Sequence, residues 1–164
     1  RRVVVYDCSP PFSLAFLSSN PCLDTLDIKA CADVAGLGIP FAELEQLENL
    51  SIRNSGNIPD DLFAASNLKL LSLTQLDGFE PLIMDWAGLG GLNKLEVLEV
   101  IKSNIGELEP LFDNAKNLRE IAVVDAQITE VSEAICALKK LKVLDLRDNE
   151  IAGLPECVKE ITEM

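Results

Sequence analysis

The sequence repeats one leucine pattern along its length, and this repeat constrains the fold more than any other feature. The stretch LKVLDLRDNEIAGLP carries the pattern nearly whole, and weaker copies recur back to the N-terminus. The copies that keep their first leucine begin at Leu23, Leu47, Leu68, Leu95, Leu118 and Leu141, with spacings of 24, 21, 27, 23 and 23 residues. An earlier copy lacks that leucine but keeps Val3, Val5 and Cys8. Periods of about 20 to 29 residues with this pattern indicate stacked repeats.

Each copy predicts one short strand, so the seven copies predict seven parallel strands. The expected strands are Val3–Tyr6, Thr25–Lys29, Asn49–Arg53, Leu70–Thr74, Val97–Ile101, Glu120–Val124 and Val143–Arg147. Within each strand two alternate side chains point into the core, and those between them lie on the concave face. The expected core pairs are Val3/Val5, Leu26/Ile28, Leu50/Ile52, Leu71/Leu73, Leu98/Val100, Ile121/Val123 and Leu144/Leu146. One repeat cannot bury its own apolar face, so stacking makes the core continuous.

The segments between the strands keep the same register as the strands. Three apolar columns recur every 23 residues, namely Leu108/Val131/Leu154, Phe112/Ile135/Val158 and Ala115/Leu138/Ile161. Spacing of three residues within a copy predicts a short α- or 3₁₀-helical turn packed on the strand layer. The copy from Leu68 to Leu95 is longer than the others and contains Trp86, which we expect to fill a wider back layer.

These residues resemble the leucine-rich-repeat (LRR) family over essentially the whole chain. The resemblance implies an α/β solenoid of about seven repeats, with a curved parallel sheet on the concave face and short helices or 3₁₀ turns on the convex face. We expect residues 1–164 to form a single LRR domain. Met164 would be the first position of an eighth copy, so we also expect a fragment cut mid-repeat at both ends. Locally, NIPDDLFAASNLKLLSL is similar to repeats of plant intracellular immune receptors of the NLR type.

Charge and cysteine content narrow the classes of partner. The chain has 14 Lys and Arg against 27 Asp and Glu, which gives a net charge of −13. Nucleic acid and anionic membranes are therefore not expected as partners, since binding them relies on basic side chains. The five cysteines are an odd number without clustered spacing. This argues against a disulfide framework, so we expect reduced thiols and a cytoplasmic location.

The residue types that most enzymes need are missing or scattered. The chain has no histidine, which excludes Ser–His–Asp and Cys–His arrangements within it. No zinc-ligand spacing is present, and Asn149 fits the buried asparagine of the repeat better than a calcium ligand. We therefore expect no catalytic residue, no metal, no cofactor and no small-molecule substrate, and we predict that the chain is not an enzyme.

The concave face holds the predicted binding residues. Ile101 and Val124 lie on adjacent strands and form an apolar centre, which is typical of protein interfaces when charged side chains surround it. An alternative reading is that β-branched residues simply favour strands. The predicted partner-binding set is Glu99, Ile101, Lys102, Ala122, Val124, Asp125, Asp145 and Arg147, with Tyr6, Lys29 and Arg53 as a secondary candidate. On each strand, the residue between the two members of the core pair is also expected to be exposed on this face. These residues are Val4, Asp27, Ser51, Ser72, Glu99, Ala122 and Asp145.

The function expected from the resemblance is binding of a protein partner through the concave strand face. One alternative is the ligand-sensing region of an intracellular immune receptor of the NLR type. A second is the substrate-recruiting arm of a multidomain enzyme such as a ubiquitin ligase or a kinase. Flanking sequence would separate these three hypotheses, because the receptor needs a nucleotide-binding segment and the enzyme needs a catalytic domain.

Overall fold

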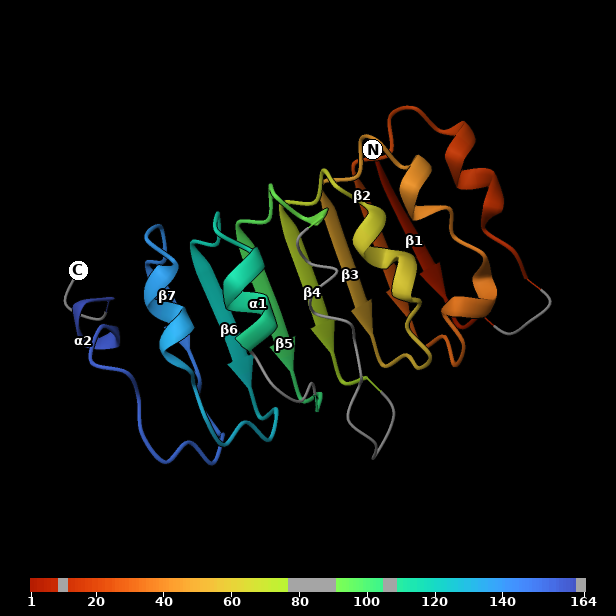
Figure 1. Ribbon diagram of the computed structural model, residues 1–164. Coiled ribbons are helices and arrows are strands. Elements are labelled where there is room, and N and C mark those ends of the chain that lie inside the picture. Colours follow the sequence, from red (N-terminus) through yellow and green to blue (C-terminus); the bar gives the residue numbers. More distant parts are fainter. Residues whose placement is uncertain (9–11, 77–90, 105–108, 162–164) are drawn as a thin grey trace.

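The computed structural model contains one sheet of seven parallel strands that follow each other in chain order (Figure 1). It describes residues 1–8, 12–76, 91–104 and 109–161. The strands are β1 (Arg2–Tyr6), β2 (Thr25–Lys29), β3 (Asn49–Arg53), β4 (Leu70–Thr74), β5 (Val97–Ile101), β6 (Glu120–Val124) and β7 (Val143–Asp145). The predicted bounds of β2 to β6 are confirmed. The last strand ends at Asp145 rather than at Arg147, and β1 begins one residue early.

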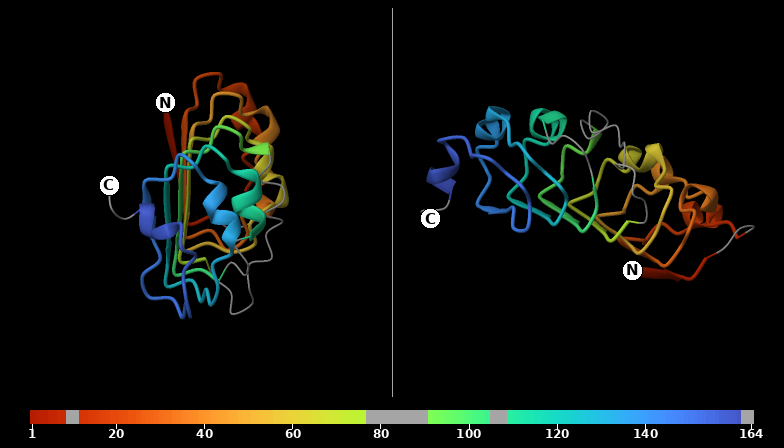
Figure 2. Two further views of the ribbon diagram at one scale, coloured as in Figure 1. Left: turned by 60° about the vertical axis from the view of Figure 1, so that its left-hand side comes forward. Right: turned by 90° about the horizontal axis from the view of Figure 1, so that it is seen from below.

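The helical segments are short, as the three-residue spacing predicts. The 3₁₀ helices are η1 (Ala15–Ser19), η2 (Ala35–Leu37), η3 (Phe41–Glu43), η4 (Asp60–Ala64) and η6 (Glu133–Ala137), and the α-helices are α1 (Glu109–Asn114) and α2 (Val158–Ile161). The 3₁₀ helices and α1 lie on one side of the sheet, and α2 lies at the C-terminal end (Figures 1 and 2). None of the helices in the described ranges is long and apolar enough to cross a bilayer.

The core lies between the sheet and the helical segments. Both members of each core pair from β2 to β6 are buried, from Leu26 and Ile28 to Ile121 and Val123. At the two ends of the sheet, Val3 of β1, Leu144 of β7 and Leu146 just after β7 are only partly buried. An end strand has a neighbouring strand on one side only, so less of each side chain is covered.

The back columns are buried with one clear exception. Val131, Phe112, Ile135, Val158, Ala115 and Leu138 are buried, and Ile161 packs against the core. The prediction for Leu154 is wrong, because this side chain is 52% exposed. It belongs to the last of the described coils, where a coil is one repeat of the solenoid, and no further coil packs over it. Leu108 and Trp86 lie outside the described residues.

The residue after each of β1 to β6 has a positive φ angle, and so has Asp148, which lies three residues after β7. This column contains Asp7, Ala30, Asn54, Gln75, Lys102, Asp125 and Asp148. Their φ angles range from 48° to 60°. The amide N–H of Lys102 donates to the carbonyl of Val124 at 2.9 Å, and the same bond recurs between other neighbouring repeats. The left-handed conformation turns the chain out of the sheet while the ladder of hydrogen bonds continues.

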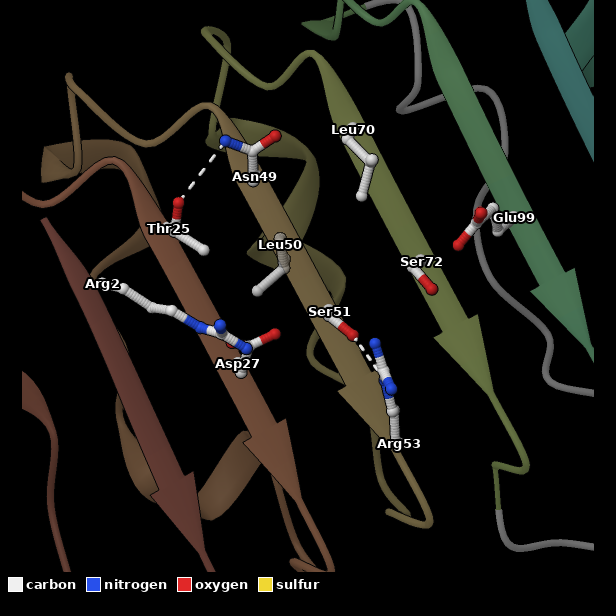
Figure 3. Close-up of a pocket in the computed structure, with 10 residues that line it drawn as sticks. All are labelled: Arg2, Thr25, Asp27, Asn49, Leu50, Ser51, Arg53, Leu70, Ser72 and Glu99. Atoms are coloured by element: carbon white, nitrogen blue, oxygen red, sulfur yellow. Dashed lines mark hydrogen bonds and ion pairs between the residues drawn. The ribbon is translucent and has the colours of Figure 1, made fainter.

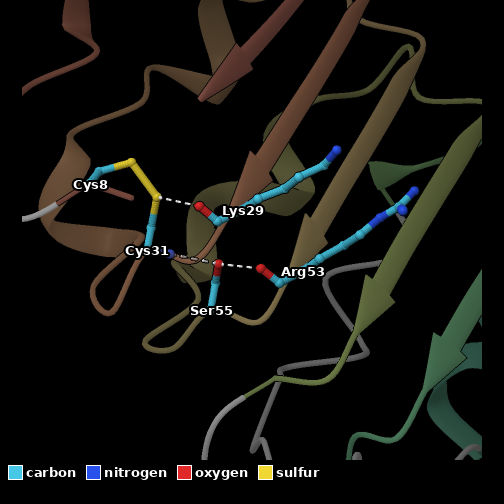
Figure 4. The surroundings of a disulfide bond; sticks show 5 residues. All are labelled: Cys8, Lys29, Cys31, Arg53 and Ser55. Carbon is cyan, nitrogen blue, oxygen red and sulfur yellow. Dashed lines mark hydrogen bonds between the residues drawn. A yellow bond between two sulfur atoms is a disulfide. The ribbon is translucent and has the colours of Figure 1, made fainter. Parts of the chain in front are cut away.

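A polar side chain in several repeats holds the turn that follows the strand. Asn149 accepts hydrogen bonds from the amides of Ala126 and Ile128 at 3.0 and 3.1 Å, and its side-chain nitrogen donates to three backbone carbonyls. This confirms the hydrogen-bonding role predicted for Asn149, although its side chain is partly rather than fully buried. Ser55 has the same position after β3. Its hydroxyl accepts a hydrogen bond from the amide of Cys31 and donates one to the carbonyl of Arg53 (Figure 4). Ser103 makes the equivalent pair of bonds.

The structure pairs four of the five cysteines, so the expectation of reduced thiols is wrong for these four. One disulfide joins Cys8 to Cys31 (Figure 4), and a second joins Cys136 to Cys157, whereas Cys22 is free. Each bond connects neighbouring coils 23 or 21 residues apart, because stacking brings equivalent positions side by side. Spacing across a repeat, rather than clustering in the sequence, is the signal for this pairing. The cytoplasmic location rested partly on reduced thiols and stays an untested prediction, against which the two disulfides argue.

Candidate functional site

The face of the sheet opposite the helical segments carries none of the described helices, and we call it the open face (Figure 2). It corresponds to the face that the sequence predicts to be concave. Strand register arranges its side chains in rows that cross the strands. One row, which we call the third row, lies nearest the carboxyl ends of the strands and contains Tyr6, Lys29, Arg53, Thr74, Ile101 and Val124, with Arg147 following on from β7.

The predicted apolar centre of the third row is present. Ile101 of β5 and Val124 of β6 are direct partners in the strand register, and both side chains remain partly exposed. Ala122 lies beside Glu99 in the adjacent row, and both are also partly exposed. The sheet therefore brings these four predicted residues together on two neighbouring strands.

An ion pair closes the C-terminal end of this centre. The Arg147 guanidinium donates to both carboxylate oxygens of Asp145, with distances from 2.7 to 3.1 Å. The hydrogen bond from Arg147 lowers the pKa of Asp145 below its ordinary value of 3.8, and Asp145 in turn raises the pKa of Arg147. Both charges are thus already partnered, so this pair forms a polar rim rather than an unpaired charge.

Three predicted site residues, Lys102, Asp125 and Arg147, lie in turns rather than on strands. Lys102 and Asp125 follow β5 and β6, with φ of 52° and 51°. Both are exposed and lie at the border of the apolar centre, just beyond the sheet. Their turn conformation places them at the rim of the apolar centre, outside the strand surface.

The secondary candidate lies at the other end of the third row. Tyr6, Lys29 and Arg53 occupy matching positions on β1, β2 and β3. The Lys29 ammonium lies 5.7 Å from the centroid of the Tyr6 ring, within the range of a cation–π contact. Tyr6 is 68% exposed. The three side chains therefore form a basic and aromatic zone, separated from the apolar centre by Thr74.

The open face also contains a hollow that the sequence did not indicate. It has a volume of about 220 Å³ and spans β1 to β5 (Figure 3). Arg2 reaches across to Asp27 and pairs with its carboxylate through Nε. Arg53 donates from Nε to the hydroxyl of Ser51 at 3.0 Å. Glu99 lines the far end of the hollow.

The residues at the floor of this hollow are more buried than the sequence predicts. Asp27, Ser51 and Ser72 were expected to be exposed, but they are 4%, 7% and 3% exposed. Adjacent strands lie about 4.8 Å apart, so the longer side chains in flanking rows cover short ones between them. Arg2 and Arg53 are two of these covering residues. A charged residue between two core positions, as Asp27 is, was the only sequence signal for this arrangement.

In the described part of the chain no three His, Cys, Asp or Glu side chains gather where they could hold a metal. The absence of catalytic residues and cofactors stays a prediction from the sequence. What the open face offers is a row with three zones: basic and aromatic, neutral, and apolar with a charged rim.

Comparison with known proteins gives matches in structure but not in sequence. No protein-family model and no curated protein sequence matches this chain. Among solved structures, internalin C2 of Listeria monocytogenes matches with a TM-score of 0.66 and 20% identity over 92% of this chain. The LRR ectodomain of the Arabidopsis receptor kinase HAESA, solved with an N-terminally extended IDA peptide hormone, matches with a TM-score of 0.72 and 23% identity over 97% of this chain. An LRR protein of Leptospira interrogans matches with a TM-score of 0.60 and 17% identity over 93% of this chain.

The matched proteins are longer than this chain. It spans 62% of the internalin C2 chain, 27% of the HAESA chain and 44% of the Leptospira chain. All three share the stacked parallel sheet, and the resemblance seen in the sequence is confirmed at the level of the fold. The chain therefore has the leucine-rich-repeat fold.

Proposed function

We propose that this chain is a recognition module that binds a protein or peptide partner through the open face of its sheet. The observation that carries the proposal is the apolar centre of Ile101 and Val124, which lies partly exposed on the uncovered face. Removing such β-branched side chains from water favours association, and charged residues around them give orientation and specificity.

The rigidity of the face supports the proposal. Six consecutive parallel pairings hold the seven strands, and the core behind β2 to β6 is fully buried. A preformed surface loses little conformational entropy when it binds, so more of the contact energy appears as affinity. The HAESA ectodomain, which has the same fold, was solved with a peptide hormone, and this supports a peptide or protein as the class of partner.

Two finer forms of the proposal use the same surface. The chain would be the ligand-sensing region of an immune receptor if a nucleotide-binding segment belongs to the same protein. It would be the recruiting arm of a ubiquitin ligase or a kinase if a catalytic domain belongs to it. In both cases the open face selects the partner, and the sequence of the complete gene separates the two forms.

The experiment is affinity capture from a lysate of the source organism, comparing the wild-type chain with an Ile101→Glu/Val124→Glu variant. We expect the variant to lose the partner, because two carboxylates would have to be buried against its apolar surface. The matched control is Phe12→Glu/Phe16→Glu, since both side chains are exposed and lie on or beside η1, away from the open face. Circular dichroism checks that all three proteins fold. Retention of the partner by Ile101→Glu/Val124→Glu would refute the proposed surface.

A further inference from the structure

The third row is not uniform, and its zones follow each other in a fixed order. Tyr6 comes first, Lys29 and Arg53 follow it, Thr74 is next, and Ile101 and Val124 come after Thr74. This order sets what a segment lying across the strands would have to carry. The inference below rests on the proposed function and specifies the chemistry of the partner.

The two cations near the start of the row are available to a ligand. Neither Lys29 nor Arg53 makes an ion pair within the described ranges. Arg53 uses Nε for the Ser51 hydroxyl, which orients the guanidinium and leaves its terminal N–H groups without a hydrogen-bond partner among the described residues. The nearby carboxylate of Asp27 is buried and paired with Arg2, so it does not neutralise them.

This zone stands out against the charge of the whole chain. The net charge is −13, and two other cations of the open face are already paired, with Arg2 on Asp27 and Arg147 on Asp145. Lys102 is not in an ion pair among the described residues, but it lies in the turn after β5, beyond the strands. A carboxylate approaching the strands of the open face would therefore find its complementary charges at Lys29 and Arg53. Guanidinium and ammonium groups form strong charge-assisted hydrogen bonds with carboxylates.

The spacing between the two zones fits an extended peptide. The midpoint of Lys29 and Arg53 lies three strands from the midpoint of Ile101 and Val124. At about 4.8 Å per strand this separation is roughly 14 Å. An extended peptide advances about 3.3 Å per residue and turns alternate side chains to one face, so positions i and i+4 lie about 13 Å apart on that face. Position i+2 would face Thr74.

We propose that the open face binds an extended peptide segment with an acidic side chain four residues before or after an aliphatic one. The carboxylate contacts Lys29 and Arg53, the aliphatic side chain packs on Ile101 and Val124, and a small or polar residue faces Thr74. The Arg147–Asp145 pair marks the far end of the site.

The test is selection of a random decapeptide phage library on the wild-type chain, followed by fluorescence titration of the synthetic winners. We expect enriched peptides with Asp or Glu four residues from Leu, Ile or Val. The Lys29→Gln/Arg53→Gln variant should bind them about tenfold or more weakly, and a Glu→Gln peptide should lose the same factor. Lys139→Gln/Lys142→Gln is the matched control, because it removes two exposed charges outside the third row and should leave affinity unchanged.

The other outcomes overturn the inference in distinguishable ways. Enriched peptides without the acidic residue, whose binding is lost in Ile101→Glu/Val124→Glu, would overturn the contact between a peptide carboxylate and Lys29 and Arg53. They would still support binding by the open face. If the Lys29→Gln/Arg53→Gln variant bound the selected peptides as tightly as the wild-type chain, the contact of a carboxylate with Lys29 and Arg53 would likewise be overturned. The absence of any enriched peptide would overturn peptide binding itself, while the capture experiment would still decide the proposed function.

Discussion

Replacing Asn149 by alanine tests how the polar side chains stabilise the turns of this solenoid. The Asn149 carbonyl oxygen accepts from the amides of Ala126 and Ile128, and its amide nitrogen contacts the carbonyls of Val123, Leu146 and Arg147. An amide has two N–H hydrogens, so the three donor contacts count as two hydrogen bonds and the total is four.

The expected magnitude follows from this count. A hydrogen bond contributes about 0.5–1.5 kcal/mol net, so four would contribute roughly 2–6 kcal/mol. Asn149 is only partly buried, and water can replace some of the lost bonds. We therefore expect Asn149→Ala to lower the free energy of unfolding by about 2–4 kcal/mol. Ser55→Ala and Ser103→Ala each remove one accepted and one donated bond, and we expect about 1–3 kcal/mol for each.

Urea unfolding followed by circular dichroism measures all three variants with the disulfides intact. Hydrogen exchange adds a local readout, because the amides of Ala126 and Ile128 should lose protection in Asn149→Ala. A smaller destabilisation by Asn149→Ala than by either serine variant would refute the reasoning, since the bond count would then fail to rank the sites. Unchanged protection of the two amides would refute it independently.

Three further predictions concern the disulfides and the pH dependence of the Asp145–Arg147 pair. Replacing Cys8 and Cys31 by alanine should lower the free energy of unfolding by about 3 kcal/mol, because the bond closes a loop of 23 residues in the unfolded chain. Urea unfolding without reductant measures this change. A loss under about 1 kcal/mol would contradict the prediction. Thiol titration of the unfolded protein should find one cysteine before reduction and five after it. The pKa of Asp145 is lowered, so its stabilising contribution is complete above its ordinary value of 3.8 and is lost as the pH falls through the lowered value. Carboxyl NMR titration should show this pKa rising in Arg147→Gln, and no change would exclude the ion pair in solution.

Much of the fold follows from the sequence alone, because each position in the repeat has the same structural role in every copy. Alternation of apolar residues places Leu98 and Val100 in the core and leaves Glu99 on the opposite face, and a common period puts Ile101 beside Val124. These assignments need only the periodicity of a strand and the length of a repeat. The same logic placed Asn149 in its turn and put Lys29 beside Arg53 on neighbouring strands.

The tertiary structure decided what depends on contacts between side chains of different coils. Asp27 is buried because Arg2 reaches over it from the next strand, and a charged residue in a strand sequence does not reveal that cover. Cys8 meets Cys31 because stacking superposes two coils, although 23 residues separate them in the chain. Leu154 has the period of a core residue but no coil packs over it, so it is exposed. Periodicity specifies which way a side chain points, whereas burial and pairing depend on what lies opposite it in space.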